Sequence, residues 1–199
     1  MSPPRRGNLL RRAANIRNLA GPVIRGLYRI QVYGLAELPV SGPVLIVGHC
    51  PDLISGILLK AVGSRPIQVI GPESMDGVIP GQFMRFMGDI PRGTAGIRAA
   101  RAGLTVLADG GALAVLGDRP PVGYLTAVSS APVVPVVILG ASGRVPTDPP
   151  PPGARISVHL FPARLVDPYE DPYALRSVQD AGERVRQFVV DAELQARAR

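Results

Sequence analysis

The chain alternates short runs of apolar, often β-branched residues with segments whose apolar residues recur at three- and four-residue steps. Strands that alternate with helices are typical of a parallel sheet covered by helices. The runs that predict strands are 30–33, 43–47, 67–70, 112–116, 133–139 and 155–161. The predicted helices are 53–62, 82–87, 95–108, 124–130 and a polar one over 171–196. We therefore predict one α/β domain with a largely parallel or mixed central sheet.

The composition fits a single domain with a substantial core and is apolar for a freely soluble protein. The chain has 199 residues, of which 46% are hydrophobic, and its mean hydropathy is +0.21. That size and composition suffice for one buried core. No run reaches the roughly 18 apolar residues that a membrane-spanning helix needs. The sequence thus favours contact with a lipid surface over a transmembrane segment.

An amphipathic helical pattern precedes the predicted sheet. Arg11, Arg25 and Arg29 lie opposite its apolar face, and Gly21-Pro22 interrupts it. A basic amphipathic helix is typical of a membrane interface, although such a helix also docks on its own domain. We predict that residues 1–29 associate with a membrane and that residues 30–199 form the α/β domain. The apolar face consists of Leu9, Ala13, Ile16, Ala20, Val23 and Leu27.

The positive charge comes almost entirely from arginine. The net charge is +7, the pI is about 10.5, and Lys60 is the only lysine. Arginine binds phosphate oxygens through two hydrogen bonds, so nucleic acid and phospholipid both qualify as partners. The chain has no Trp and only 5% aromatic residues, which disfavours a surface on which bases stack. We expect an anionic phospholipid membrane as partner, and no nucleic acid.

The chain contains few cysteines and histidines. Cys50 is the only cysteine, which excludes an internal disulfide, and His49 and His159 lack the spacing of a metal site. The basic N-terminus has no compact apolar run that ends in a cleavage site. We therefore expect no metal and a cytoplasmic protein. His159 alternates with apolar residues on a late strand, which is typical of a packing residue.

The segment PVLIVGHCPDLISG, residues 43–56, combines an apolar strand, a histidine and a turn. His49 directly follows the strand, and a strand end is a rigid position for a general base. A histidine there also satisfies local backbone groups in many proteins, so both interpretations stay open. Asp52 is a candidate partner of His49, although its place after Pro51 is typical of a helix N-cap.

The order of these segments resembles the lysophospholipid acyltransferase family, which acylates glycerolipids in phosphatidic acid synthesis. In that family a basic amphipathic N-terminus precedes a glycine and a proline, which correspond here to Gly34 and Pro39. A strand then ends in Asn-His, with an aspartate five residues after the histidine. This chain keeps His49, but it has Gly48 for the asparagine and Ile54 for the aspartate.

Three further blocks follow in the order found in the family. Residues 88–92 (GDIPR) are similar to the second block, which makes Arg92 a candidate for phosphate binding. Asp118 and Arg119 stand in the third block, which binds the acceptor in the family, and Asp118 takes the place of a glutamate. The sequence Gly-Asp-Arg-Pro is equally typical of a simple turn. Residues 133–137 (VVPVV) keep the Val-Pro-Val of the fourth block. The resemblance covers roughly residues 5–190.

The resemblance implies a membrane-associated O-acyltransferase of phospholipid biosynthesis, with residues 30–199 as its acyltransferase-like domain. It would transfer a fatty acyl group from a thioester of coenzyme A or acyl-carrier protein to a lysophospholipid or related lipid hydroxyl. His49 would be the base, Arg92 and Arg119 would contact phosphate, and no cofactor would be bound. The protein would be peripheral on the cytoplasmic face of the cell membrane.

Two departures from the family affect the residues closest to the chemistry. Ile54 cannot orient an imidazole or stabilise an imidazolium, as a carboxylate does. Asp118 is one methylene shorter than the family's glutamate. A second interpretation is therefore a catalytically degenerate acyltransferase fold that binds lipid or a protein partner. Cys50, next to His49, is a further candidate nucleophile, although a lone cysteine is usually structural.

Overall fold

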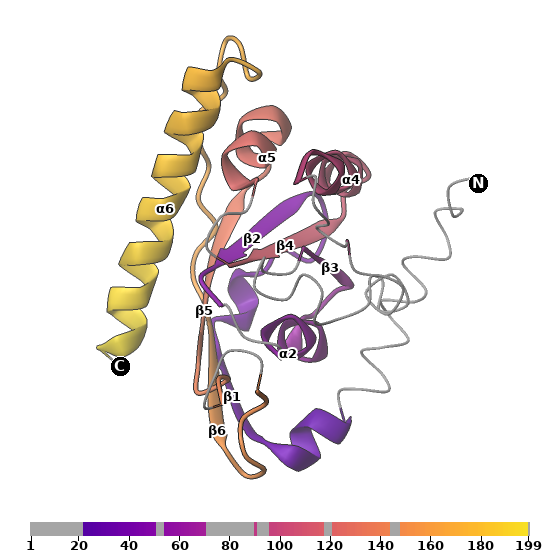
Figure 1. The fold of residues 1–199 in the computed structure, drawn as a ribbon, viewed down its shortest axis with the longest axis vertical. Helices are drawn as coiled ribbons and strands as arrows, with labels where there is room; N and C mark the ends of the chain where they lie inside the picture. Colours follow the sequence, from indigo (N-terminus) through magenta and orange to yellow (C-terminus); the bar gives the residue numbers. More distant parts are fainter. Residues whose placement is uncertain are drawn as a thin grey trace, which may run out of the picture.

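The computed structural model describes residues 22–50, 54–70, 90, 96–117, 121–143 and 148–198, which form one α/β domain (Figure 1). The strands are β1 (Arg29–Tyr33), β2 (Val44–Gly48), β3 (Ile67–Ile70), β4 (Ala112–Leu116), β5 (Val133–Leu139) and β6 (Arg155–Leu160). The helices are η1 (Leu35–Glu37), α2 (Ser55–Val62), α4 (Gly96–Ala108), α5 (Val122–Ser129) and α6 (Leu175–Arg197). In addition, residues 22–27 are helical.

The six strands form a mixed sheet in the order β1-β6-β5-β2-β4-β3. Strands β3, β4, β2 and β5 are parallel, β6 is antiparallel to β5, and β1 is parallel to β6. Strands β2, β3 and β4 are buried throughout, because helices cover both faces of a parallel sheet. The predicted fold class is confirmed, and the strand limits differ from the predicted ones by a residue at most.

Helices cover the two faces of the sheet unequally. On one face, Leu59 and Val62 of α2 pack against Ile46 and Val136 of the sheet. On the other face, α4, α5 and α6 pack against the side chains that alternate with these, in a cluster that includes Leu113. Figure 1 shows α6 running along the sheet over β5. A continuous core therefore lies on each side of the central strands.

The N-terminal helix extends less far than the sequence pattern indicated. Arg29 belongs to β1, where its N–H donates to the carbonyl of Ala154 at 2.9 Å. Pairing with β6 takes precedence there over the helical repeat. In the helix, Ile24 is buried, whereas Val23 and Leu27 are 60% and 44% exposed. Arg11, most of the predicted N-terminal segment and the predicted helix 82–87 lie outside the described residues.

One of two facing glycines allows α5 and α6 to approach each other closely. A Cβ at Gly123 would overlap the carbonyl oxygen of Val178 and lie 3.0 Å from the backbone N of Gly182. In contrast, a Cβ at Gly182 would meet its nearest atom, the Cα of Gly123, at an ordinary 3.6 Å. Only Gly123 is therefore required for this contact between the two helices.

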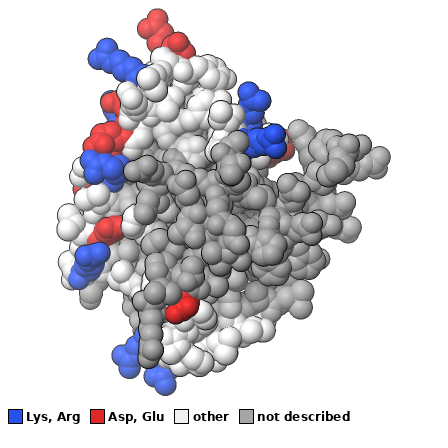
Figure 2. All heavy atoms as spheres, viewed as in Figure 1, with Lys and Arg blue, Asp and Glu red and all other residues white. Residues whose placement is uncertain are grey.

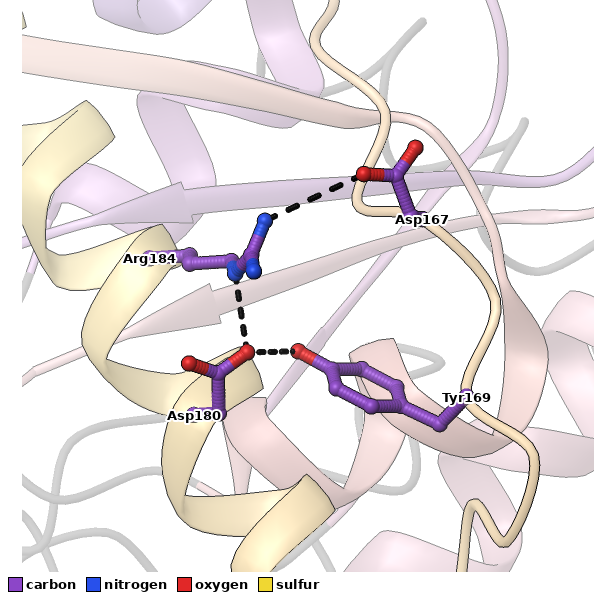
Figure 3. Close-up of polar contacts among 4 residues, drawn as sticks. All are labelled: Asp167, Tyr169, Asp180 and Arg184. Atoms are coloured by element: carbon purple, nitrogen blue, oxygen red, sulfur yellow. Dashed lines mark hydrogen bonds and ion pairs between the residues drawn. The ribbon is translucent and has the colours of Figure 1, made fainter.

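A second contact holds α6 to the loop before it. Figure 2 shows acidic and basic side chains interspersed along α6, and Figure 3 shows one cluster among them. The Tyr169 hydroxyl donates to Asp180 Oδ2 at 2.6 Å, and Arg184 Nε donates to the same oxygen at 2.8 Å. Arg184 also forms a 3.9 Å ion pair with Asp167. The cluster joins the loop to the first three turns of the helix.

We expect Gly123→Ala to lower the free energy of unfolding by about 1–3 kcal/mol, because overpacking separates α5 from α6. Its matched control is Gly182→Ala, which should leave stability unchanged or raise it by up to about 1 kcal/mol through better helix propensity. Urea denaturation followed by circular dichroism measures both. Equal destabilisation by the two substitutions would contradict the described helix contact.

The Tyr169 cluster predicts a loss of stability in alkali. Burial, followed by the hydrogen bond to Asp180, raises the pKa of Tyr169 to about 12. A pKa that is higher in the folded than in the unfolded protein stabilises the fold. This contribution is complete below the tyrosine pKa of the unfolded chain, about 10, and disappears as the pH rises through 12. Tyr169→Phe should therefore reduce the fall in melting temperature between pH 10 and 12. Tyr173→Phe, at an exposed tyrosine, is the control, and identical pH profiles for the two variants would disprove the interaction.

Candidate functional site

His49 lies at the edge of the sheet where β2 and β4 end side by side. Gly48, the last residue of β2, pairs with Leu116, the last residue of β4. The N–H of Gly117 donates to the carbonyl of Gly48 at 3.1 Å. His49 follows Gly48 directly, and its side chain is exposed. The carboxyl edge of an open parallel sheet is the usual place for a ligand site.

The segments that precede the other predicted blocks reach the same edge. Ile90 forms a parallel bridge with Ile70, the last residue of β3, and its N–H donates to Val69 at 3.0 Å. Gly117 is at the end of β4. Arg92 follows Ile90 by two residues, while Asp118 and Arg119 follow Gly117. These three residues and Asp52 lie outside the described residues, so their assignments stay predictions.

The glycine that replaces the family's asparagine has a packing role. A Cβ at Gly48 would overlap the carbonyl oxygen of Val136 on β5 and lie 2.8 Å from Val136 Cγ1. An asparagine at this position would therefore require β5 to move away from β2. Glycine allows the two strands to pack closely where β2 ends.

Ile54 is a core residue at the start of α2. It is 8% exposed and belongs to an apolar cluster with Ile24, Leu58, Ala141 and Ile156. Ile24 comes from the N-terminal helix, so Ile54 also contributes to the attachment of that helix. A carboxylate here would be surrounded by apolar groups, which disfavour its ionised form. The position that carries an aspartate in the family is used for packing in this chain.

The candidate nucleophile Cys50 and the remaining histidine, His159, both lie in packed surroundings. Cys50 is 2% exposed within the core cluster on the α2 face, whereas reactive thiols are usually at least partly exposed. His159 is 4% exposed, its Nε2 lies 3.1 Å from Ser157 Oγ, and its ring stacks on Tyr33 at 4.7 Å. His159 is thus a packing residue of β6, as its alternation with apolar neighbours indicated.

The structure adds one basic residue that sequence reasoning missed. Arg155 begins β6 and is the register partner of Arg29 in β1. Both side chains are exposed. The sequence pattern identified the two strands, but it gave no signal for their pairing, because β1 and β6 are more than a hundred residues apart.

Two negative findings apply to the described part of the chain. Within those residues, no cluster of three or more His, Cys, Asp or Glu side chains could hold a metal ion. Among the described helices, none is long and apolar enough to cross a membrane.

Comparison with known proteins shows the fold. No family model and no curated protein matches the sequence. Among solved structures, the chain is similar to the crystal structure of the 1-acyl-sn-glycerophosphate (LPA) acyltransferase PlsC from Thermotoga maritima, with a TM-score of 0.55 and 19% identity. The match covers 92% of this chain and 79% of that one. The chain therefore has an acyltransferase-type α/β fold, as the sequence resemblance implied.

Proposed function

We propose that the protein is a membrane-associated O-acyltransferase that transfers a fatty acyl group from a thioester to the hydroxyl of a lysophospholipid or related lipid. The observation that carries the proposal is the position of His49, exposed at the carboxyl edge beside the end of β4. The similarity of the fold to that of PlsC supports it.

His49 provides the general base of the proposed reaction. Its imidazole takes the proton of the acceptor hydroxyl while that oxygen attacks the thioester carbonyl. The tetrahedral intermediate then collapses, the carbon–sulfur bond breaks, and the thiolate takes up a proton as it leaves. The thioester belongs to coenzyme A or acyl-carrier protein and acts as a co-substrate, so the protein needs no bound cofactor.

The acceptor phosphate is the proposed ligand of Arg92 and Arg119, with Asp118 in the place of the family's glutamate. Support comes from the chain path, because Ile90 and Gly117 reach the edge that carries His49. Arginine is suited to this role because its planar fork matches phosphate oxygens. Asp52 stays a proposed orienting partner of His49.

The proposed location is the cytoplasmic face of an anionic membrane. Arg11, Arg25 and Arg29 supply the attraction to headgroups, and the apolar N-terminal residues enter the interface. The exposed side chains of Val23, Leu27, Arg25 and Arg29 support this part of the proposal.

A second candidate function is lipid or partner binding without catalysis. The burial of Ile54 favours it, since no carboxylate at that position supports His49. In the serine-protease triad, loss of the orienting aspartate alone lowers kcat by about 10⁴-fold. Under this alternative, the purified protein binds lysophospholipid but transfers no acyl group.

The first test is acyl transfer by the purified protein from acyl-CoA or acyl-carrier protein to lysophosphatidate. We expect slow transfer, and a reduction of about 10²–10⁴-fold in His49→Ala, because the general base is lost. Cys50→Ala is the control and should retain the activity. Transfer that survives His49→Ala would disprove the proposed mechanism, whereas lysophosphatidate binding without transfer would establish the second candidate.

A second test asks whether Ile54 can be returned to the family's aspartate. Ile54→Asp should lower the free energy of unfolding by about 3–5 kcal/mol, because the carboxylate is buried without a partner, and it should not raise activity. Ile54→Val, which keeps the site apolar, should cost only about 0.5–1.5 kcal/mol. Thermal unfolding and acyl transfer are measured on both variants. A stable, more active Ile54→Asp would mean that this carboxylate reaches His49.

A further inference from the structure

Two arginines lie side by side where the edge strand β1 and its neighbour β6 begin. Arg29 of β1 and Arg155 of β6 are register partners in a parallel pair of strands. Neighbouring strands are about 4.8 Å apart, and paired residues point to the same face. Both side chains are exposed. Two permanent positive charges therefore project together from adjacent strands.

This pairing is unfavourable for the isolated protein. Like charges directly opposite each other destabilise a sheet. Some arginines elsewhere pair with acids: Arg164 pairs with Asp191 at 3.3 Å, and Arg184 pairs with Asp180 at 2.8 Å. Neither Arg29 nor Arg155 forms an ion pair with an acidic residue in the described part of the chain. An external anion held between the two guanidinium groups would relieve their repulsion.

A hollow beside Arg29, which Arg155 does not line, combines cationic and apolar surfaces. It has a volume of about 430 Å³. Arg25, Tyr28 and Arg29 line it together with the apolar side chains of Ile30, Val32 and Val62. Val23 and Leu27, on the neighbouring helix, are exposed as well. Such a surface fits a ligand that carries both a phosphate and hydrocarbon, as a phospholipid does.

The arginine pair lies toward the same end of the sheet as His49, measured along the direction of β2. Val47 pairs with Pro135, so β2 ends at the level of Val136, which pairs with Leu160 of β6. Arg155 is five residues before Leu160, or about 16 Å farther out in the direction in which β2 points. The pair therefore projects beyond the edge that carries His49. Figure 2 shows basic side chains at the lower end of the molecule, where β1 and β6 lie in Figure 1.

We propose that Arg29 and Arg155 form a binding site for the phosphate of an anionic phospholipid headgroup, and that this site turns the His49 edge toward the bilayer. The orientation of His49 rests on the proposed acyltransferase function, whereas the headgroup site does not. A nucleic acid fits less well, because the neighbouring hollow and helix present apolar side chains. The two arginines act in binding and orientation, and they take no part in the chemistry of transfer.

The proposal is tested by cosedimentation of the full chain with vesicles of phosphatidylcholine, alone or mixed with phosphatidylglycerol. A basic residue near an anionic membrane contributes about fivefold to the partition coefficient. Arg155→Gln should thus reduce binding to mixed vesicles about fivefold, and Arg29→Gln with Arg155→Gln about 25-fold. The matched control is Arg176→Gln, an exposed arginine in the first turn of α6, far from β1 and β6 in Figure 1. This control should change binding less than twofold.

The same variants distinguish lost binding from misfolding. Because the pair is repulsive, Arg155→Gln should melt at the same temperature as the parent or higher, and mixed vesicles should stabilise the parent more than the variant. Equal binding of parent and Arg155→Gln to mixed vesicles would overturn the proposal. It would also be overturned if inorganic phosphate or a short oligonucleotide protected the parent in an Arg155-dependent way while mixed vesicles did not.

Acyl transfer in neutral detergent micelles tests the proposed acyltransferase activity independently of the headgroup site. Arg155→Gln should transfer as fast as the parent in micelles and more slowly on mixed vesicles, which would support both the site and the orientation of His49. A parent that shows no transfer, yet binds mixed vesicles through Arg155, would remove the proposed function and leave the headgroup site supported. Equal loss of transfer in micelles and on vesicles would overturn the binding role.

Discussion

The close approach of β2 to β5 at Gly48 is the constraint on which the arrangement of the site depends. The glycine lets the Val136 carbonyl approach where a side chain would stand, and the Gly48 carbonyl accepts a hydrogen bond from Gly117 at 3.1 Å. The end of β2 is thereby fixed from both sides. His49 is the next residue, so its backbone starts from a rigid position at the centre of the carboxyl edge.

The core of this fold could be predicted from the sequence because buried parallel strands are continuous apolar runs. Runs such as 112–116 and 133–139 matched β4 and β5 residue for residue. The order of the strands could not be predicted in the same way, because it depends on contacts between distant segments. Strands β1 and β6 run antiparallel to the other strands, and their pairing brings Arg29 next to Arg155. This pairing leaves no local signal in the sequence. For the site, sequence reasoning placed His49 at a strand end, but it gave no reason for Gly48 or Ile54.

Two residues that differ from the motif of the acyltransferase family that the sequence resembles have packing roles. Gly48 accommodates the neighbouring strand, while Ile54 joins Ile24 in the cluster that secures the N-terminal helix to the start of α2. An isoleucine at this position gives the helix an apolar contact and carries no carboxylate that could support a histidine. Ile54 thus favours a firmly held N-terminal helix. The packing of Ile54 is consistent with both proposed functions, slow acyl transfer on a membrane and lipid binding without catalysis.

The charged residues fall into two groups, those that form ion pairs along α6 and the arginines near the start of β1 and β6. Along α6, arginines alternate with acids and form ion pairs such as Arg184 with Asp180, which hold the helix to the loop before it. Where the N-terminal helix, β1 and β6 meet, Arg25, Arg29 and Arg155 are exposed and form no ion pair within the described part of the chain. Paired arginines are locally neutral and contribute little field, whereas Arg25, Arg29 and Arg155 make their corner of the molecule positive. This corner lies toward the end of the sheet that carries His49. An approaching anionic surface would therefore be drawn to the end at which the proposed chemistry takes place.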